Sequence, residues 1–242
     1  MLVHGRDGER CRATVDEIRA ASGNDRVHGY VADLSALANV RRLADEVTRD
    51  HERLDVLVNN AGTVSRERQE SEDGYELTFA VNYLAHFLLT DRLLPLLRGS
   101  APARIVSVAS IGQAPIDFDD VMLERSYDPM RAYSQSKLAQ IMFTFELAER
   151  LGSHADVTVN CLHPATLMNT KMVMSTLGRS TATVEEGAEA TLQLICDPAL
   201  DGTTGRYFDG LEESQPHPQA HDAGARRRLW QLSEELVGAA RP

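Results

Sequence analysis

Short apolar runs alternate with longer stretches of helical periodicity along this chain, and this alternation constrains the fold more than any other feature. Strand-length and helix-length segments in turn are typical of βαβ units, in which helices cover both faces of a parallel sheet. No internal repeat or linker interrupts the pattern, so we predict one α/β domain over residues 1–242 with a doubly wound parallel sheet. The predicted strands are Met1–His4, Val27–Ala32, Leu54–Val58, Ile105–Ala109, Val157–Leu162 and Arg206–Phe208.

Between these runs, apolar residues recur at helical spacing. Cys11, Val15 and Ile18 predict a first helix that ends near Gly23, and Ser35 is placed to cap a second one. A connection of about twenty residues follows Ala109, which is longer than most loops, and long connections often carry function. The remaining predicted helices are Gly74–Arg98, Ala132–Leu151, Val184–Cys196 and Ala223–Val237.

Composition and charge exclude several classes of function. The formal net charge of −11 disfavours a nucleic-acid partner, because phosphate binding needs clustered cations. The three cysteines lie far apart, which predicts free thiols and a cytoplasmic protein. His217 and His221 are separated by Pro218, so a helical metal site is not predicted. The apolar stretch Leu77–Thr90 is too short to span a bilayer.

Tyr133 and Lys137 stand four residues apart on a predicted helix, so both side chains lie on one face. A phenol with a pKa of about 10 exchanges protons poorly at neutral pH, and a cation beside it favours the phenolate. Lowering that pKa by about three units requires about 4 kcal/mol of preferential stabilisation, which a nearby ammonium can supply in large part. An ordinary surface pair would have the same spacing, so the pair needs support from elsewhere in the chain.

Other polar residues are predicted to lie near this pair. Ser110 follows the strand Ile105–Ala109, and Asn59–Gly62 ends the strand before it. The carboxyl ends of parallel strands meet at one edge of the sheet, which is where open α/β folds bind ligands. Asn82 lies in the long helix between the two strands. The four side chains of a proton-transfer site are therefore predicted at one edge.

These residues resemble the short-chain dehydrogenase/reductase family. The resemblance covers nearly the whole chain and implies a Rossmann-like sheet and oxidation or reduction of a small alcohol or carbonyl with a nicotinamide cofactor. A tyrosine and lysine at this spacing are a weak signal alone, whereas six matches in the family's order are specific. The matches are Asp33-Leu34, Asn59-Asn60-Ala61-Gly62, Asn82, Val106–Ser110, Tyr133 with Lys137, and His163–Thr166.

The resemblance also implies a role for each residue. Tyr133 is the general acid or base, Ser110 hydrogen-bonds the substrate oxygen, and Lys137 lowers the tyrosine pKa and holds the nicotinamide ribose. Asn82 anchors a water that links Lys137 to solvent. The family usually has proline-glycine where this chain has Pro164-Ala165. The cofactor-binding residues implied besides Tyr133 and Lys137 are Asp33, Leu34, Asn60, Ala61, Gly62, Pro164, Ala165 and Thr166.

Arg6 bears on which nicotinamide cofactor is used. An acid at the end of the family's second strand would favour NAD by binding the free ribose hydroxyl. This chain has Arg6 there, and a guanidinium can form charged hydrogen bonds to the additional phosphate of NADP. A solvated arginine beside a capping Asp7 is the alternative interpretation. We predict a preference for NADP(H) over NAD(H).

The connection from Ile116 to Asp128 resembles the branch of retinol-dehydrogenase-like and WW-domain-oxidoreductase-like proteins, which often act on apolar alcohols or aldehydes. Met168, Met172 and Met174 follow the Pro164 motif and are able to line an adaptable apolar pocket. They are equally compatible with a place in the core. The resemblance therefore implies a small, apolar alcohol or carbonyl, whose identity the sequence leaves open.

A glycine-rich turn that cradles the cofactor pyrophosphate opens most members of this family, and this sequence lacks it. Gly5 and Gly8 follow the second family strand and do not replace it. We therefore expect a fold without the family's first strand and first helix, with inner sheet edges left unpaired. Three explanations stay open: a true start upstream of Met1, a truncated descendant filled by rearrangement or a partner, or an intact protein that no longer binds cofactor.

Two functional classes follow from these explanations. The complete set of Asn82, Ser110, Tyr133 and Lys137 predicts an enzyme. The missing glycine turn supports a rival, a catalytically inactive family member that serves as an interaction module. The family commonly pairs through the helices around Asn82 and Tyr133, which implies a homodimer or homotetramer.

Overall fold

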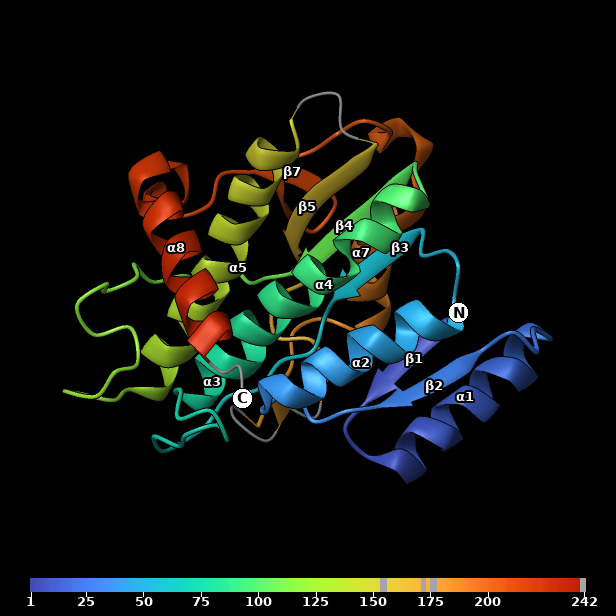
Figure 1. Ribbon diagram of the computed structural model, residues 1–242, viewed down its shortest axis with the longest axis horizontal. Helices are drawn as coiled ribbons and strands as arrows, with labels where there is room; N and C mark the ends of the chain where they lie inside the picture. Colours follow the sequence, from blue (N-terminus) through green and yellow to red (C-terminus); the bar gives the residue numbers. More distant parts are fainter. Residues whose placement is uncertain (153–155, 171–172, 175–177, 240–242) are drawn as a thin grey trace.

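The computed structural model describes residues 1–152, 156–170, 173–174 and 178–239, and it confirms the α/β fold class (Figure 1). Strands and helices alternate as the apolar pattern predicts. Their order is β1 (Leu2–Gly5), α1 (Gly8–Ser22), β2 (His28–Val31), α2 (Leu37–Asp50), β3 (Val56–Asn59), α3 (Leu77–Phe79), the π-helical turn η1 (Ala80–Leu84), α4 (Ala85–Gly99), β4 (Ala103–Val108), α5 (Pro129–Leu151), β5 (Val157–His163), α7 (Val184–Cys196), η2 (Pro198–Leu200), β6 (Tyr207–Asp209), β7 (Glu212–Ser214), η3 (Pro218–His221) and α8 (Ala223–Ala239).

The strands form two sheets where one was predicted. The larger sheet has the order β3-β4-β5-β6-β7, and its first four strands run parallel. The edge strand β7 is antiparallel to β6 and was not predicted, because its three residues Glu212–Ser214 carry no apolar pattern. The smaller sheet consists of β1 and β2, which pair in parallel with Leu2 opposite His28.

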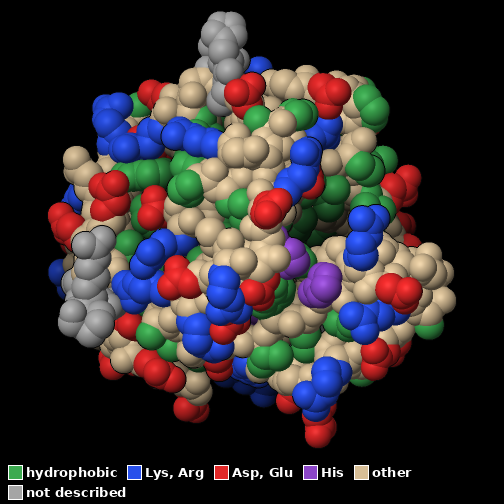
Figure 2. Space-filling view, turned by 45° about the vertical axis from the view of Figure 1, so that its right-hand side comes forward, with side chains coloured by type: hydrophobic (Ala, Val, Ile, Leu, Met, Phe, Trp, Pro, Cys, Tyr) green, Lys and Arg blue, Asp and Glu red, His purple; other side chains and the backbone are tan. Residues whose placement is uncertain are grey.

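The division of the sheet leaves two inner edges open. Among the described strands, β1 pairs only with β2 and β3 pairs only with β4. Among the described residues, no strand joins the two sheets. Figure 1 shows the β1–β2 pair with α1 on the right of the molecule, and Figure 2, turned so that this side comes forward, shows a hollow with hydrophobic side chains inside it.

Both faces of the central strands are buried, which explains their nearly continuous apolar runs. Side chains alternate between two clusters: Ile105 and Val159 belong to the larger one, whereas Val106 and Leu162 belong to the smaller one, which α7 covers. The larger cluster lies beneath α2, α4, α5 and α8. The doubly wound arrangement thus follows from the period of two in each strand.

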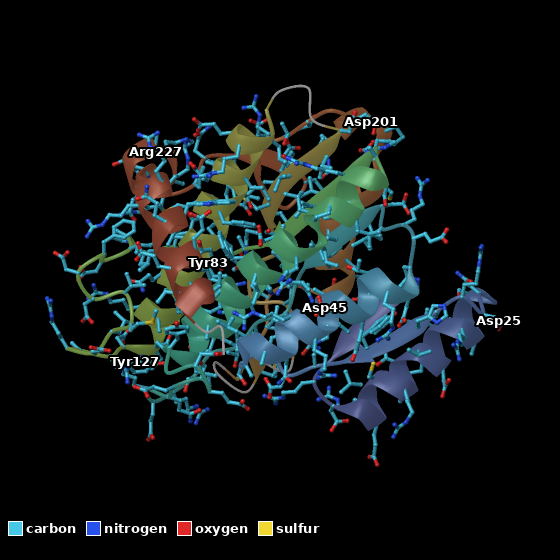
Figure 3. All side chains as sticks on the ribbon, in the orientation of Figure 1. Asp25, Asp45, Tyr83, Tyr127, Asp201 and Arg227 are labelled. Carbon is cyan, nitrogen blue, oxygen red and sulfur yellow. The ribbon has the colours of Figure 1, made fainter. Side chains whose placement is uncertain are left out.

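α8 binds to the larger face through aromatic side chains and one buried hydrogen bond. The rings of Phe87 and Phe143 lie 5.0 Å and 5.8 Å from that of Trp230. Tyr83, labelled in Figure 3, is 1% exposed, and its hydroxyl lies 2.7 Å from the Ser233 hydroxyl. α8 therefore covers the helices that carry Asn82 and Tyr133.

Helix ends are set largely by side-chain caps, and one predicted cap is wrong. Asp128 accepts a hydrogen bond from Arg131 N at the start of α5. The first helix ends near Gly23, as predicted, and Gly23 adopts the left-handed conformation. Ser35 does not cap α2, because the N-cap residue is Ala36 and the Leu37 N–H donates to Asp73 Oδ2 at 2.8 Å. A carboxylate distant in sequence takes the place of the local hydroxyl.

The helix predicted over Gly74–Arg98 is continuous from Leu77 to Gly99 but contains the π-helical turn η1. Asn82 lies in the middle of this turn. π-Helical turns within helices are uncommon and are found often at functional sites, because they turn a side chain away from the regular helical direction. Local sequence periodicity does not predict the additional residue in this turn.

Candidate active site

The carboxyl ends of β3 and β4 bring the predicted catalytic residues together. Ser110 follows β4, whereas Tyr133 and Lys137 belong to the first turns of α5. Lys137 Nζ donates to the carbonyl oxygen of Val108 at 2.8 Å, which fixes α5 against the end of β4. A side chain added at Gly112 would lie 3.6 Å from Ser110 Oγ and 3.8 Å from Tyr133 Cε1, so both groups line the backbone at this glycine.

Burial sets the proton affinities of this pair in a way the sequence did not predict. The pKa of Tyr133 is raised by burial, and the Ser110 side chain offsets part of that rise. Burial lowers the pKa of Lys137 to about 7. Lys137 Nζ lies 5.7 Å from the centre of the Tyr133 ring. The direction is opposite to the depressed tyrosine pKa that was expected, because burial disfavours the charged phenolate.

Asn82 hydrogen-bonds the loop that follows β3. Its Oδ1 accepts from Thr63 N at 2.7 Å, and its Nδ2 donates to Thr63 O at 3.0 Å and to Ser136 Oγ at 3.0 Å. Because Asn82 is fully buried, these bonds fix the Asn60–Gly62 segment relative to α5. This contact to the loop is a role that the sequence comparison missed, and the predicted water beside Asn82 stays a prediction.

The predicted cofactor-binding residues follow successive strands. Arg6 is exposed just after β1, and Asn60–Gly62 follow β3. Asp33 and Leu34 follow β2, where Asp33 Oδ1 accepts from Ser35 N at 2.9 Å. Pro164, Ala165 and Thr166 follow β5, and Thr166 Oγ1 lies 3.0 Å from His163 Nε2. All of them therefore lie after carboxyl ends of parallel strands, as predicted.

The two described methionines of the following segment, Met168 and Met174, are not buried in the core. Met168 is half-buried, and its Sδ atom lies 2.1 Å from the position that a Cβ at Gly187 would take. A side chain at position 187 would therefore require Met168 to move. Met174 is 42% exposed, and Met172 lies outside the described residues.

The described residues fit one end of a nicotinamide cofactor better than the other. Lys137 and Tyr133 offer an ammonium and a hydroxyl at the place where a ribose and a reacting carbonyl would bind. The helix N-termini after β1 and β2, however, are closed by carboxylates: Asp7 accepts from Arg10 N, and Asp73 accepts from Leu37 N. A carboxylate there excludes a phosphate, so neither helix of the described chain is a pyrophosphate cradle.

The chain matches a model of the family described as short chain dehydrogenase over residues 1–179. It belongs to the short-chain dehydrogenase family. This assignment confirms the predicted resemblance and makes the protein an NAD(P)-dependent oxidoreductase.

Curated relatives and solved structures are similar to most or nearly all of this chain. Retinol dehydrogenase 13 of Mus musculus is 38% identical over 263 aligned residues, covering 99% of this chain and 77% of the relative. A solved structure from Mycobacterium paratuberculosis is 30% identical, covers 98% of this chain and 83% of its own, and superposes with a TM-score of 0.77. A short-chain dehydrogenase from Shigella flexneri complexed with NADP is 25% identical, covers 86% and 85%, and has a TM-score of 0.68.

None of the helices in the described ranges is both long and apolar enough to cross a membrane. A cavity of about 490 Å³ lies near the C-terminal end of α5 and the β6–β7 edge. Phe145, Tyr207 and Arg226 are among its lining residues, and none of the four candidate catalytic residues belongs to them. The cavity is therefore separate from the proposed site of proton transfer.

A buried polar chain behind Lys137 was missed by the sequence analysis. Lys137 Nζ also donates to Gln140 Oε1 at 2.9 Å, and Gln140 Nε2 lies 2.9 Å from His86 Nδ1. Burial lowers the pKa of His86 to about 3. The only sequence signal was a polar residue at position 86 within the apolar face of a helix, and such residues are more often structural than catalytic.

The depressed pKa of His86 predicts a specific loss of stability in acid. From its ordinary value of 6.5 down to about pH 3, the unfolded chain binds a proton that the folded chain does not. The free energy of unfolding therefore falls as the pH falls through this window, by up to about 1.4 kcal/mol per pH unit. We expect His86→Asn to flatten that slope in urea unfolding, and the exposed control His28→Asn to retain it. Equal slopes in the wild type and His86→Asn would contradict the prediction.

Proposed function

We propose that this short-chain dehydrogenase transfers a hydride between NADP(H) and a small, apolar alcohol or carbonyl compound, with Tyr133 as the general acid or base. The observation that carries the proposal is the meeting of Tyr133, Ser110 and Lys137 at the carboxyl end of β4. When bound, the nicotinamide supplies or accepts the hydride, and the protein supplies the proton transfer and the electrostatic stabilisation.

Each residue acts on the substrate oxygen or on the tyrosine. During reduction the Tyr133 hydroxyl gives its proton to the carbonyl oxygen, and Ser110 Oγ donates a hydrogen bond to the same oxygen as its negative charge grows. The resulting phenolate is stabilised by the Lys137 ammonium and recovers its proton from solvent. During oxidation the same phenolate accepts the proton of the alcohol. Lys137 has to be protonated for this purpose, and its pKa of about 7 places that requirement near neutral pH.

Exposed apolar side chains support an apolar substrate. Ile111, directly after Ser110, is 55% exposed, and Met174 and Leu211 are 42% and 46% exposed. Ile111 follows the carboxyl end of β4 and Met174 follows that of β5, where the substrate would enter. Leu211 lies in the turn between β6 and β7. Retinol dehydrogenase 13, a relative over nearly the whole chain, is named for an apolar alcohol.

Steady-state kinetics with NADPH and aldehydes of increasing chain length test the proposal. Each additional buried methylene contributes about 0.8 kcal/mol, so kcat/KM is expected to rise at least about tenfold from a three-carbon to a ten-carbon aldehyde. Equal values for the two aldehydes would exclude an apolar pocket. The absence of NADPH consumption with every aldehyde would exclude the reaction itself.

Arg6 supports the preference for NADP. Its side chain is exposed after β1, at the edge where the adenosine end of the cofactor is proposed to bind, and the Shigella flexneri relative is complexed with NADP. Charged hydrogen bonds of this kind contribute about 1.5–3 kcal/mol. We therefore expect Arg6→Ser to lower the NADP-to-NAD ratio of kcat/KM by about 10- to 100-fold, whereas the exposed control Arg12→Ser leaves it within threefold. A wild-type ratio that favours NAD would contradict the assignment.

The rival function, an inactive interaction module, has one observation in its favour. The open edges of β1 and β3 and the capped helix N-termini leave the phosphates of the cofactor without a cradle among the described residues. A calorimetric titration of the whole chain with NADPH separates the two functions. Binding at micromolar concentration supports the enzyme, and no binding at high micromolar concentration supports the module.

The proposal also places the protein in the cytoplasm. The three cysteines are free, as a reducing compartment favours. A dimer or tetramer through the helices around Asn82 and Tyr133 is less favoured than the family resemblance implied, because α8 of the same chain covers them. Light scattering that shows a dimer would therefore require an interface elsewhere on the surface.

A further inference from the structure

We infer that Gln140 is a positioning residue that holds the Lys137 ammonium where it stabilises the Tyr133 phenolate. His86 in turn fixes the orientation of the Gln140 amide. The inference rests on the proposed function of Lys137. It adds two residues that act through Lys137 and not on the substrate.

The contacts form an unbroken buried chain. Lys137 Nζ donates to Val108 O at 2.8 Å and to Gln140 Oε1 at 2.9 Å, and Gln140 Nε2 lies 2.9 Å from His86 Nδ1. The exposed fractions of Lys137, Gln140 and His86 are 4%, 1% and 2%. An ammonium has three N–H donors, and the described residues use two of them, which leaves one for the tyrosine or the ribose.

The chemistry of the three groups permits only one arrangement of this chain. An ammonium only donates, so Gln140 has to present its oxygen to Lys137 and its NH₂ group to the histidine. His86 then has to accept at Nδ1 and carry its proton on Nε2. Burial holds the pKa of His86 at about 3, so the ring stays neutral and does not become a donor at Nδ1 near neutral pH.

The second ring nitrogen of His86, Nε2, indicates that the histidine is required for the hydrogen bond between its Nδ1 atom and Gln140. His86 Nε2 is buried and has no hydrogen-bond partner among the described residues. A buried donor without a partner costs about 1–3 kcal/mol, which an apolar side chain at position 86 would avoid. The bond at Nδ1 is therefore the feature that distinguishes histidine from a packing residue here.

An amide suits this position better than a carboxylate would. The titratable groups around Lys137 are Tyr133 on its own helix, His86 on α4 and His163 at the end of β5. No described carboxylate forms an ion pair with Lys137. Gln140 thus stabilises the charged form of the lysine without neutralising it, so the full positive charge acts on the tyrosine.

The small number of lysines in the sequence allows the pKa of Lys137 to be measured directly, which tests the positioning role of Gln140. Lys137 and Lys171 are the only lysines among 25 basic residues, so nitrogen-15 labelling of lysine gives two resonances, and Lys171→Arg assigns them. We expect Gln140→Met to lower the pKa of Lys137 by about one unit, because a hydrogen bond to a charged group is lost. Gln140→Glu is expected to raise it. The matched control is Gln135→Met, since Gln135 is also buried on α5 but donates to Val121 O.

Kinetics give the second readout. In alcohol oxidation with NADP⁺, Gln140→Met is expected to lower kcat about tenfold and to move the acid limb of the pH profile, with the KM for cofactor changed less than threefold. Gln135→Met is expected to reduce thermal stability and to leave the profile in place. His86→Leu should resemble Gln140→Met, whereas His86→Asn keeps an acceptor near the Nδ1 position and should be milder.

The outcomes separate this inference from the proposed function. An unchanged Lys137 pKa in both Gln140 variants, or an equal shift in Gln135→Met, overturns the positioning role whether or not the enzyme turns over. An inactive wild type in which the Lys137 pKa moves as described overturns the proposed function and leaves the amide as the group that holds the lysine.

Discussion

Lys137→Met is expected to lower turnover strongly and at the same time to make the fold more stable at neutral pH. Lys137 is 4% exposed, and its burial without an ion pair lowers its pKa from 10.5 to about 7. Because burial disfavours the charged lysine, an apolar side chain of similar length at this position is expected to stabilise the fold. The loss of the ammonium removes the stabilisation of the Tyr133 phenolate, for which we expect a fall in kcat/KM of at least about 100-fold.

The pH dependence gives this prediction an internal control. Because the folded pKa of Lys137 lies below the unfolded one, burial costs most at and below pH 7, where the lysine is charged in both states. The cost declines as the pH rises towards 10.5, where both states are neutral. The advantage of Lys137→Met in urea unfolding should therefore be largest near neutral pH and small above about pH 10. A variant that is less stable than the wild type at pH 7 would contradict this account of the buried charge.

Tyr133→Phe is expected to lower kcat/KM by about 10²- to 10⁴-fold, the usual contribution of a positioned acid or base. The ring and its packing remain, so the affinity for NADPH should change less than threefold. Burial raises the pKa of Tyr133, and the proposal assigns the activation of the phenol to the Lys137 charge. A variant that retains more than about a tenth of the wild-type activity would remove Tyr133 from the proposed mechanism.

Tyr127 offers the matched control. It lies in the connection between β4 and α5, labelled in Figure 3, and its hydroxyl donates to Ser65 O at 2.8 Å. Tyr127→Phe loses one hydrogen bond, which contributes about 1 kcal/mol to stability. We expect a modest fall in the free energy of unfolding and kcat/KM within threefold of the wild type. A large loss of activity in both tyrosine variants would point to disorder of the site and not to proton transfer.

Most helices and parallel strands were predictable because their signals are local. Asp128 before α5 and Gly23 after α1 define helix ends through bonds within four residues. β4 and β5 carry apolar residues on both faces and so stand out in the sequence. The features that were missed depend on distant residues: Asp73 replaces Ser35 as the acceptor at α2, and β7 exists only through its pairing with β6.

The same distinction holds for the site. Motif order led to Ser110, Tyr133 and Lys137 as candidates, and the strand order places them at one edge of the sheet. Gln140 and His86 are 54 residues apart, and nothing in either local sequence shows that one accepts a bond from the other. The sequence also could not predict whether the pKa values of Tyr133 and Lys137 are raised or lowered. Those shifts depend on how far the folded chain buries each group away from water.

Transfer of deuterium from cofactor to product tests the central claim most directly. The whole chain would be incubated with NADPH carrying deuterium at the reactive carbon of the nicotinamide and with a ten-carbon aldehyde, and the alcohol analysed by mass spectrometry. The account predicts one deuterium on the product carbon, and none in Tyr133→Phe at the same time point. An alcohol that carries no deuterium from the cofactor, or no alcohol while NADPH binds tightly, would contradict hydride transfer as the function of this protein.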